Sequence, residues 1–303
     1  MQILNPYNRA GVWLRGSFHN HTSNSDGWFP LETVYKMYAG YDFLGISDHD
    51  IITRHEGERN IKTVFEAIEV SSRQTHMLLV KPPLSMMDNY SNEFTIENYQ
   101  RLADMAAANG GFAVLVHPNR YFSNYWTLED MMKMERYLGI EIYNGDGNPE
   151  YDIAFDKWDA LLSAGRKVWG FGNDDSHVYG QEKRAWNMVL TNEETGEAIV
   201  ESIKNGSFYV STGYGFDAIR TEGRTITVDL RSNKLLDSMY KYVTLFGKDG
   251  KVLQETTGRI KQVQYECKGD EGYVRIEAYL EGGYAAFSQP LYVETDGITA
   301  QHR

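Results

Sequence analysis

Two histidines one residue apart, His19 and His21, follow an apolar run near the start of the chain. Side chains at alternate positions of a strand point to the same face, so both imidazoles can bind one metal ion. Asp26 lies close behind them, and Asp48 and His49 end the next apolar run. Six of the eight histidines lie at such places, namely His19, His21, His49, His76, His117 and His177. This concentration of imidazoles and carboxylates at strand ends predicts a divalent metal centre.

Seven short apolar runs position these residues. They span residues 12–18, 43–46, 67–70, 77–80, 111–116, 139–143 and 167–172. Helical patterns lie between several of the runs, at 30–39, 96–109, 128–138 and 154–164. Two of these patterns are followed by Gly110 and Gly165, as is typical of helix ends. Alternating strands and helices predict a parallel α/β barrel, in which the loops after the strands bring the functional residues to one face.

The pattern changes after about Glu222, where alternating β-type runs begin. We expect strands over 225–230, 240–246, 259–266, 273–280 and 291–294, separated by turns rich in Gly, Asp and Lys. The chain is therefore predicted to divide into a metallohydrolase barrel, residues 1–222, and a small antiparallel β-sandwich of Ig-like type, residues 223–303. If the two parts have separate cores, a chain that ends at Glu222 should keep its metal. If two apolar strands of the second part seal against the barrel, truncation should instead cause aggregation.

Composition excludes several classes of protein. The chain has 303 residues, a hydrophobic fraction of 42%, a net charge of −12 and one cysteine. One cysteine excludes a disulfide framework and multi-thiolate zinc sites. The acidic balance argues against general nucleic-acid binding, and no run is long and apolar enough for a membrane span or an export signal. We therefore expect a soluble, cytoplasmic protein.

Because the chain carries a net charge of −12, an anionic substrate has to be attracted by cationic side chains close to the site. Arg120, shortly after His117, and Arg184 are candidates to clamp a phosphate, because a guanidinium matches the geometry of phosphate oxygens. A surface salt bridge is the alternative for Arg184.

Five motifs occur in order between residues 16 and 177. They are His19-Asn20-His21-Thr22 with Ser25-Asp26-Gly27, Ser47-Asp48-His49-Asp50, Glu69 with His76, Val116-His117-Pro118, and Asp174-Asp175-Ser176-His177. Together they resemble the PHP (polymerase and histidinol phosphatase) superfamily. Two later segments, residues 183–213 and 286–293, resemble the PHP subgroup named for the CehA and McbA metallohydrolases.

The resemblance implies a distorted (β/α)7 barrel and a set of metal ligands. It assigns a first ion to His19, His21, Glu69 and Asp175. It assigns a second ion to Glu69 as a bridge with His76 and His117, and a third to Asp26, His49 and His177. Ile68 stands where the family often has a glycine, and residues 173–177 read Asn-Asp-Asp-Ser-His where Gly-Ser-Asp-Ala-His is usual. Neither departure removes a ligand.

Polar neighbours of the motifs are expected to support the ligands. Asp48 and Asp174 each precede a ligand, and we expect them to orient imidazoles by accepting hydrogen bonds, with solvation of a strand end as the alternative. Glu141 and Asn144 either line the same face or have a capping role.

We expect two or three divalent ions, Zn, Mn or Fe, because imidazole and carboxylate ligands suit these metals. A bound ion lowers the pKa of water from about 15.7 toward about 7, which makes hydroxide available at neutral pH. The expected function is a metal-dependent phosphoesterase that uses such a metal-activated hydroxide on a small phosphorylated molecule at a di- or trinuclear centre. Glu69, Asp175 and Arg120 are its predicted catalytic residues.

Two alternatives stay open. The same centre can serve a carboxylic or carbamate ester hydrolase, for which an apolar, aromatic mouth is typical, whereas a basic mouth favours phosphate. The other alternative is a metal-stabilised binding module, although the complete ligand set argues against it.

Overall fold

The computed structural model describes residues 1–55, 60–73, 75–120, 125–146 and 153–295. The α-helices are α1 (Leu31–Met37), α2 (Ile96–Ala108), α3 (Leu128–Lys133), α4 (Phe155–Ser163) and α5 (Gly196–Lys204). The strands up to residue 211 are β1 (Gln2–Leu4), β2 (Val12–Ser17), β3 (Phe43–Ile46), β4 (Thr63–Ser71), β5 (His76–Val80), β6 (Phe112–Leu115), β7 (Gly139–Asn144), β8 (Trp169–Asn173), β9 (Trp186–Thr191) and β10 (Phe208–Ser211). They are followed by β11 (Phe216–Glu222), β12 (Thr225–Leu230), β13 (Lys241–Phe246), β14 (Val252–Gly258), β15 (Gln262–Glu266), β16 (Tyr273–Leu280), β17 (Ala285–Ser288) and β18 (Leu291–Glu294).

All seven predicted runs of the first part form strands, β2 to β8, which lie in chain order in one large sheet. Most neighbours in this series are parallel, but β5 is antiparallel to both β4 and β6. β4 and β5 are joined by only a few residues, too few for the crossover that a parallel pair needs. The order of paired strands in the described residues is open, running from β1 to β8 without a pairing that closes it. The α/β class is thus confirmed, whereas the closed barrel is not.

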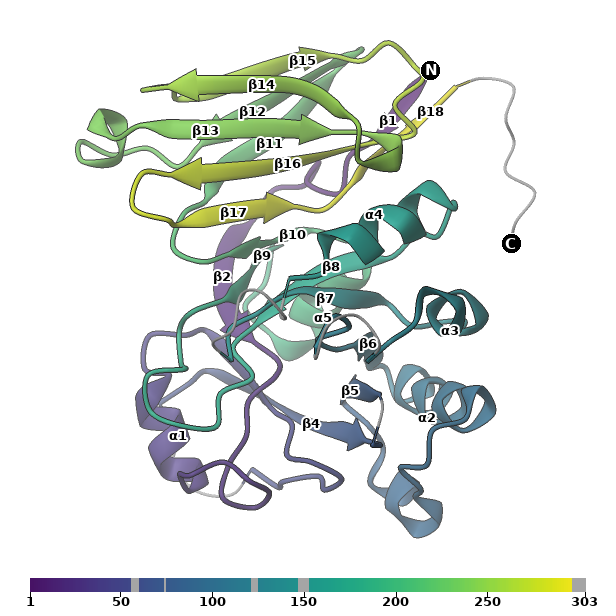
Figure 1. The fold of residues 1–303 in the computed structure, drawn as a ribbon. Coiled ribbons are helices and arrows are strands. Elements are labelled where there is room, and N and C mark those ends of the chain that lie inside the picture. The colour runs from purple at the N-terminus through teal and green to yellow at the C-terminus, as the bar shows by residue number, and fades with distance from the viewer. Residues whose placement is uncertain (56–59, 74, 121–124, 147–152, 296–303) are drawn as a thin grey trace.

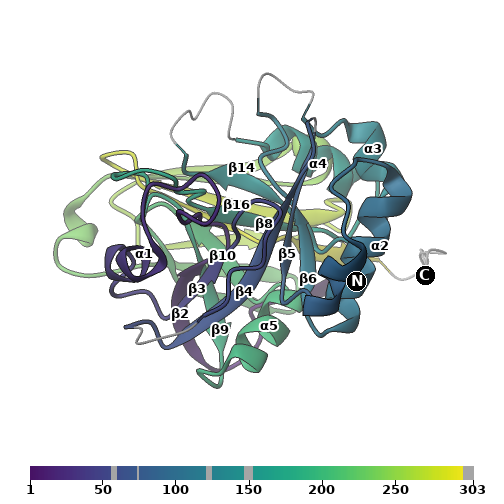
Figure 2. The same cartoon turned by 90° about the horizontal axis from the view of Figure 1, so that it is seen from below.

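Helices α1, α2 and α5 lie outside these strands when the molecule is seen from below (Figure 2). Thr95 caps α2 by accepting a hydrogen bond from the Asn98 backbone N–H at 3.1 Å. Gly110 follows α2 with φ of 81°, a left-handed conformation that glycine adopts without steric cost. The helix α3 ends at Lys133, earlier than predicted, because Met134 is already extended with ψ of 137°.

The strands after β10 lie at the opposite end of the molecule from α1 and α2 (Figure 1). β11, β12 and β15 form a three-stranded sheet, while β13, β14, β16, β17 and β18 belong to the large sheet. Ile226 and Val228 of the small sheet pack in one apolar cluster with Val243 and Ile276 of the large sheet. The N-terminal strand β1 pairs with β18, so both ends of the described chain meet in this region.

Strand pairing and packing cross the division expected at Glu222. β11 ends at Glu222 and pairs with β12, and β10 pairs with β17. Phe287 of β17 packs on Phe155 of α4 with ring centroids 4.8 Å apart. The buried Arg275 guanidinium of β16 donates two hydrogen bonds to Asp159 of α4, at 2.8 and 2.6 Å. The two parts therefore share an apolar cluster and a buried ion pair, and the domain division stays a prediction.

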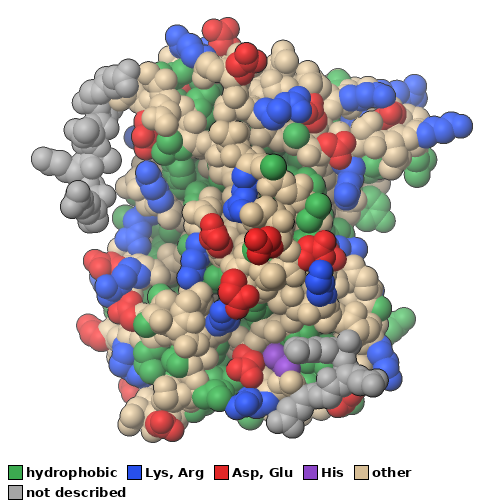
Figure 3. Space-filling view, turned by 180° about the vertical axis from the view of Figure 1, so that it is seen from behind, with side chains coloured by type: hydrophobic (Ala, Val, Ile, Leu, Met, Phe, Trp, Pro, Cys, Tyr) green, Lys and Arg blue, Asp and Glu red, His purple; other side chains and the backbone are tan. Residues whose placement is uncertain are grey.

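Charges on the surface are mixed. On the face drawn in Figure 3, acidic and basic side chains are interspersed. Among the helices that the structure describes, none combines the length and the apolar character of a membrane span.

Candidate metal centre

Backbone hydrogen bonds bring the ends of β2 and β8 together. Asn20 and Ser176 form an isolated parallel bridge. The Asp175 N–H donates to the carbonyl of His19 at 2.9 Å, and the His21 N–H donates to the carbonyl of Ser176 at 3.1 Å. These contacts place three predicted ligands from distant parts of the sequence side by side.

Four atoms converge beside this bridge: His19 Nε2, His21 Nε2, Glu69 Oε2 and Asp175 Oδ1. Each nitrogen lies 3.2 Å from the Glu69 oxygen and 3.1 Å from the Asp175 oxygen. All four atoms are buried, and none makes a hydrogen bond with the residues that the structure describes. Ligands held at about 2.0–2.1 Å from a tetrahedral ion lie about 3.3–3.4 Å apart. The four atoms therefore fit a divalent cation, and these are the residues predicted for the first metal ion.

Glu69 is the central carboxylate of the cluster. It lies near the end of β4, where an isolated bridge aligns it with His49. Its Oε1 is 2.7 Å from His76 Nδ1 and 2.9 Å from His117 Nε2, while its Oε2 is 3.0 Å from His49 Nδ1. The carboxylate thus faces both predicted ligand sets, as a bridging ligand must. His49 joins Glu69 and His76 in a second group able to hold an ion, although the resemblance placed His49 with the third.

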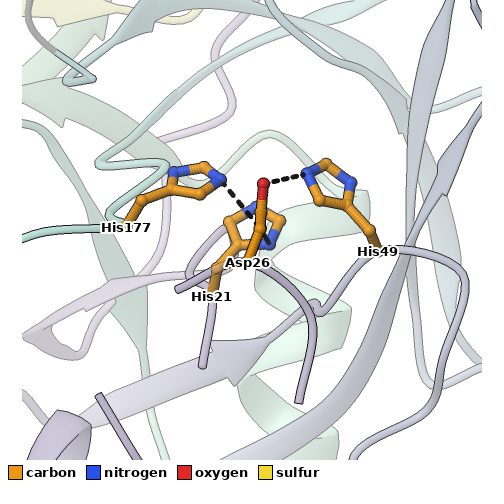
Figure 4. Close-up of side chains that lie close together, drawn as sticks. All are labelled: His21, Asp26, His49 and His177. Carbon is orange, nitrogen blue, oxygen red and sulfur yellow. Dashed lines mark ion pairs between the residues drawn. The ribbon is translucent and has the colours of Figure 1, made fainter. Parts of the chain in front are cut away.

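Asp26 lies between His177 and His49 in the third group (Figure 4). Its Oδ1 is 3.3 Å from His177 Nε2, and its Oδ2 is 3.5 Å from His49 Nε2. His21 Nδ1 is 3.8 Å from Asp26 Oδ1, so His21 turns one nitrogen toward this group and the other toward the first. The Asp26 side chain is 57% exposed, whereas Glu69 is buried, so this group lies nearer to solvent.

The buried carboxylates and imidazoles of the cluster shift one another's pKa values. Burial opposes ionisation of Glu69, but the surrounding histidines, His19 first, hold its pKa well below the usual range. Burial also opposes protonation of His19, but Asp175 and Glu69 outweigh it and raise the His19 pKa well above its ordinary value. Burial and the neighbouring Arg120 lower the pKa of His117 to about 4. His117 is therefore a neutral imidazole at neutral pH, the form that binds a metal ion.

Glu141 of β7 is the buried carboxylate that supports the ligands. Its Oε1 lies 2.8 Å from His19 Nδ1 and accepts a hydrogen bond from Asn173 Nδ2 at 2.9 Å. Its Oε2 accepts from the His117 backbone N–H and from Asn144 Nδ2, both at 2.9 Å. A carboxylate on Nδ1 fixes the tautomer of His19 and leaves Nε2 as the ligand atom. The only sequence signal for this role is a charged residue inside an apolar run.

Among the described residues, no imidazole donates a hydrogen bond to Asp48 or Asp174, so their predicted role is wrong. Asp48 accepts hydrogen bonds from the backbone N–H and the hydroxyl of Thr22, at 2.6 and 2.7 Å. Asp174 accepts from the backbone N–H groups of residues 183, 184 and 185, at 2.7–2.8 Å. Asp48 precedes His49 in an extended segment, where neighbouring side chains point to opposite sides. Asp174 precedes Asp175, whose φ of 49° is left-handed, so the strand rule does not apply to that pair. Both carboxylates fix the loops around the site instead.

The two candidate phosphate-binding arginines lie in different settings. Arg120 Nη2 donates to Oδ2 of the ligand Asp175 at 2.9 Å and to Asp146 at 2.5 Å. Arg184 is exposed and donates to the backbone carbonyls of residues 180 and 145, at 2.7 and 3.2 Å. Arg120 is therefore part of the site, while these two hydrogen bonds of Arg184 stabilise the surrounding loops.

Two contacts to the outer ligands carry no sequence signal. Ser71 Oγ lies 2.5 Å from His49 Nδ1, and the Tyr125 hydroxyl lies 2.7 Å from His76 Nε2. Neither residue belongs to a sequence motif. Only the folded chain brings each of them next to its histidine.

A scan against protein-family models and a search of curated proteins found no match. Among solved structures, the chain is similar to a two-domain protein from Bacteroides vulgatus that contains a predicted PHP-like metal-dependent phosphoesterase. The TM-score is 0.48 and the identity 16%, over 91% of this chain and 92% of that one. It is also similar to PsfC from Pseudomonas syringae, with a TM-score of 0.45 and 14% identity, over 63% of this chain and 87% of that one. The first description names the PHP class that the motifs predict. Neither names the CehA and McbA subgroup, which stays a prediction.

Proposed function

We propose that this protein is a metal-dependent phosphoesterase that hydrolyses a small phosphorylated molecule. The observation that carries the proposal is the convergence of four buried ligand atoms, from His19, His21, Glu69 and Asp175, without hydrogen bonds to described residues. Burying unsatisfied polar atoms costs free energy, so such an arrangement is retained where a cation satisfies them. The absence of thiolates and the partial exposure of Asp26 support a catalytic site over a structural one.

Divalent ions held by these ligands supply a nucleophile at neutral pH and stabilise charge on phosphate oxygens. Hydrolysis of a phosphate ester breaks one P–O bond, and water provides the new oxygen on phosphorus while the leaving alcohol takes a proton. In this scheme Glu69 bridges two ligand sets and Glu141 fixes the ring of His19. Arg120 orients Asp175 through its Oδ2, which directs Oδ1 toward the cluster. Arg120 is also the proposed contact of the protein with the substrate phosphate.

The order of the strands β2 to β8 also bears on the fold of the first part of the chain. The strands β2 to β8 follow one another in chain order, and the bridge between Asn20 and Ser176 joins the segments after the first and the last of them. This arrangement supports a distorted (β/α)7 barrel of PHP type, with a smaller C-terminal β-sandwich packed on it. Two or three ions of Zn, Mn or Fe are the proposed cofactors.

The test uses the full chain, stripped with chelator and reloaded separately with Zn, Mn or Fe. We expect release of inorganic phosphate from phosphomonoesters in a panel that also holds phosphodiesters and neutral carboxylic esters. Replacement of a central ligand, Asp175→Asn, should abolish turnover. The matched control is Glu271→Gln, which alters a buried carboxylate in the segment between β15 and β16 and should leave kcat/KM unchanged. A metal-loaded protein that releases no phosphate from any ester would contradict the proposal.

One observation favours hydrolysis of a neutral ester as a second candidate. Trp28 and Tyr179 are 73% and 78% exposed, and each lies two residues from a ligand, Asp26 or His177. Exposed aromatic side chains near a candidate site suit an apolar substrate. Turnover of carboxylic or carbamate esters, with none of phosphate esters, would support this candidate.

A further inference from the structure

A pocket of about 420 Å³ adjoins the metal centre, and the mechanism above does not use it. Its walls come from the end of β4 and from the segment before α2, and they consist of Ser71, Ser72, Arg73, Asn92, Glu93 and Phe94. This volume lies within the range of small-molecule sites. The pocket is therefore large enough for part of a substrate, although not for a macromolecule.

Direct contacts join the pocket to two candidate ligands. Ser71 Oγ lies 2.5 Å from His49 Nδ1, and the Ser72 carbonyl oxygen lies 3.2 Å from His76 Nε2. A molecule that reaches the ions at these histidines therefore has this pocket directly beside it.

The pocket wall is held in place by Asp50. Its carboxylate accepts hydrogen bonds from the Ser71 backbone N–H at 2.9 Å, from Asn92 Nδ2 at 2.8 Å and from the Tyr90 hydroxyl. Asn92 also donates to the Ser71 carbonyl at 3.0 Å. On the other side, the ring of Phe94 packs edge-on against the buried ring of Tyr99 at 5.0 Å. The wall is thus formed before a ligand binds, which reduces the entropy cost of binding.

The charges of the pocket indicate what it binds. Arg73 is exposed, and it makes no ion pair with the residues that the structure describes. Its guanidinium offers donors suited to a carboxylate or phosphate. Glu93 lines the same pocket and can accept a hydrogen bond from a hydroxyl group. The pair matches a molecule that carries an anionic group and a hydroxyl.

We infer that this pocket binds the leaving group of the substrate and selects alcohols that carry an anionic group, which Arg73 contacts. The inference rests on the proposed phosphoesterase function and adds a substrate class to it, namely phosphate esters of hydroxy acids. Arg73 is then a specificity residue, separate from the ligands of the metal centre.

The test compares two phosphate esters that differ in one group. The leaving alcohol of 3-phosphoglycerate carries a carboxylate where that of glycerol 3-phosphate carries a hydroxymethyl group. We expect the metal-loaded protein to prefer 3-phosphoglycerate in kcat/KM. Arg73→Gln should lower this preference about tenfold, as loss of one charge-assisted hydrogen bond predicts, and mainly through KM. Arg73→Lys, which keeps the charge, should restore part of the preference.

The matched control is Arg259→Gln, an exposed arginine in the turn between β14 and β15, which should leave the preference unchanged. Calorimetric binding of glycerate and glycerol provides a readout that needs no hydrolysis. If glycerate binds through Arg73 but neither ester is hydrolysed, the pocket assignment stands and the phosphoesterase function fails. If both esters are hydrolysed with a preference that Arg73→Gln does not change, the pocket assignment fails and the function stands.

Discussion

Substitution of Glu141 by Gln tests whether the buried support of the metal ligands matters. The two carboxylate oxygens face four nitrogen groups, two on each side, from His19, Asn173, His117 and Asn144. A glutamine has the same shape but carries one NH2 group. Whichever way it turns, that NH2 group faces at least one fixed donor, Asn173 Nδ2 on one side or the His117 N–H and Asn144 Nδ2 on the other, so that donor loses its acceptor.

The expected effect is a weaker metal site. When Glu141 no longer accepts from His19 Nδ1, the ring can take the tautomer with its proton on Nε2, the atom that faces Glu69 and Asp175. Loss of such support typically lowers metal affinity by 10- to 100-fold. This corresponds to about 1.4–2.7 kcal/mol of binding free energy.

Competition with a chromophoric chelator measures the dissociation constant for each metal in Glu141→Gln and in the unaltered chain. Glu271→Gln is the matched control, since Glu271 is a buried carboxylate that accepts hydrogen bonds from backbone N–H groups and from Tyr265 far from the cluster. The control should lower stability without changing metal affinity. A dissociation constant of Glu141→Gln within twofold of the unaltered chain would refute the reasoning.

Three further predictions concern the same framework. Protein purified without chelator should hold about two or three metal ions per chain by elemental analysis. Metal removal should lower its melting temperature, because the ions bind only the folded cluster. Less than half an equivalent of metal would argue against a cluster. Glu69→Gln should lose more metal and activity than His49→Asn. The reason is that the Glu69 carboxylate lies within 3.2 Å of nitrogens from five histidines, whereas His49 is partly exposed. Equal losses would contradict a bridging role. A chain that ends at Glu222 should aggregate, as size-exclusion chromatography would show. It exposes β10 and the face of α4 that contacts Phe287 and Arg275. A monodisperse truncated chain that keeps its metal would show that these contacts are dispensable.

Most of the candidate ligands could be predicted from the sequence because they lie at or near the ends of strands, although Asp26 lies in a turn. His19 and His21 are two residues apart on β2 and its extension, so the period of a strand already places their rings on one side. The strands β2 to β8 were predicted from another local signal, the short apolar runs. What each candidate ligand faces depends on pairings between distant segments. The bridge of His49 with Glu69, for example, brings His49 to Glu69 and His76 in addition to the expected group with Asp26 and His177.

The support around the ligands could not be read in the same way. Glu141 becomes the acceptor for four groups only when β2, β6, β7 and β8 have assembled, and no spacing in the sequence records this. The C-terminal strands illustrate the same limit. Arg275 and Asp159 are 116 residues apart, yet they form a buried pair between β16 and α4. The sequence predicted the strand β16 and offered its contact with the barrel as one alternative, but it did not identify α4 or Asp159 as what the strand contacts.

Two of the candidate ligands, His117 and Asp175, have a strained backbone. His117 and Asp175 have φ of 31° and 49°, a left-handed region that residues other than glycine rarely adopt. Each such residue costs about 1–3 kcal/mol and persists only where its surroundings determine it. At Asp175 the backbone N–H is held by the carbonyl of His19, and at His117 the N–H is held by Glu141. The hydrogen bonds that gather the candidate ligands therefore also anchor the backbone of the two strained residues. The chain thus holds His117 beside Glu69 and Asp175 beside His19 and His21 before any ion binds.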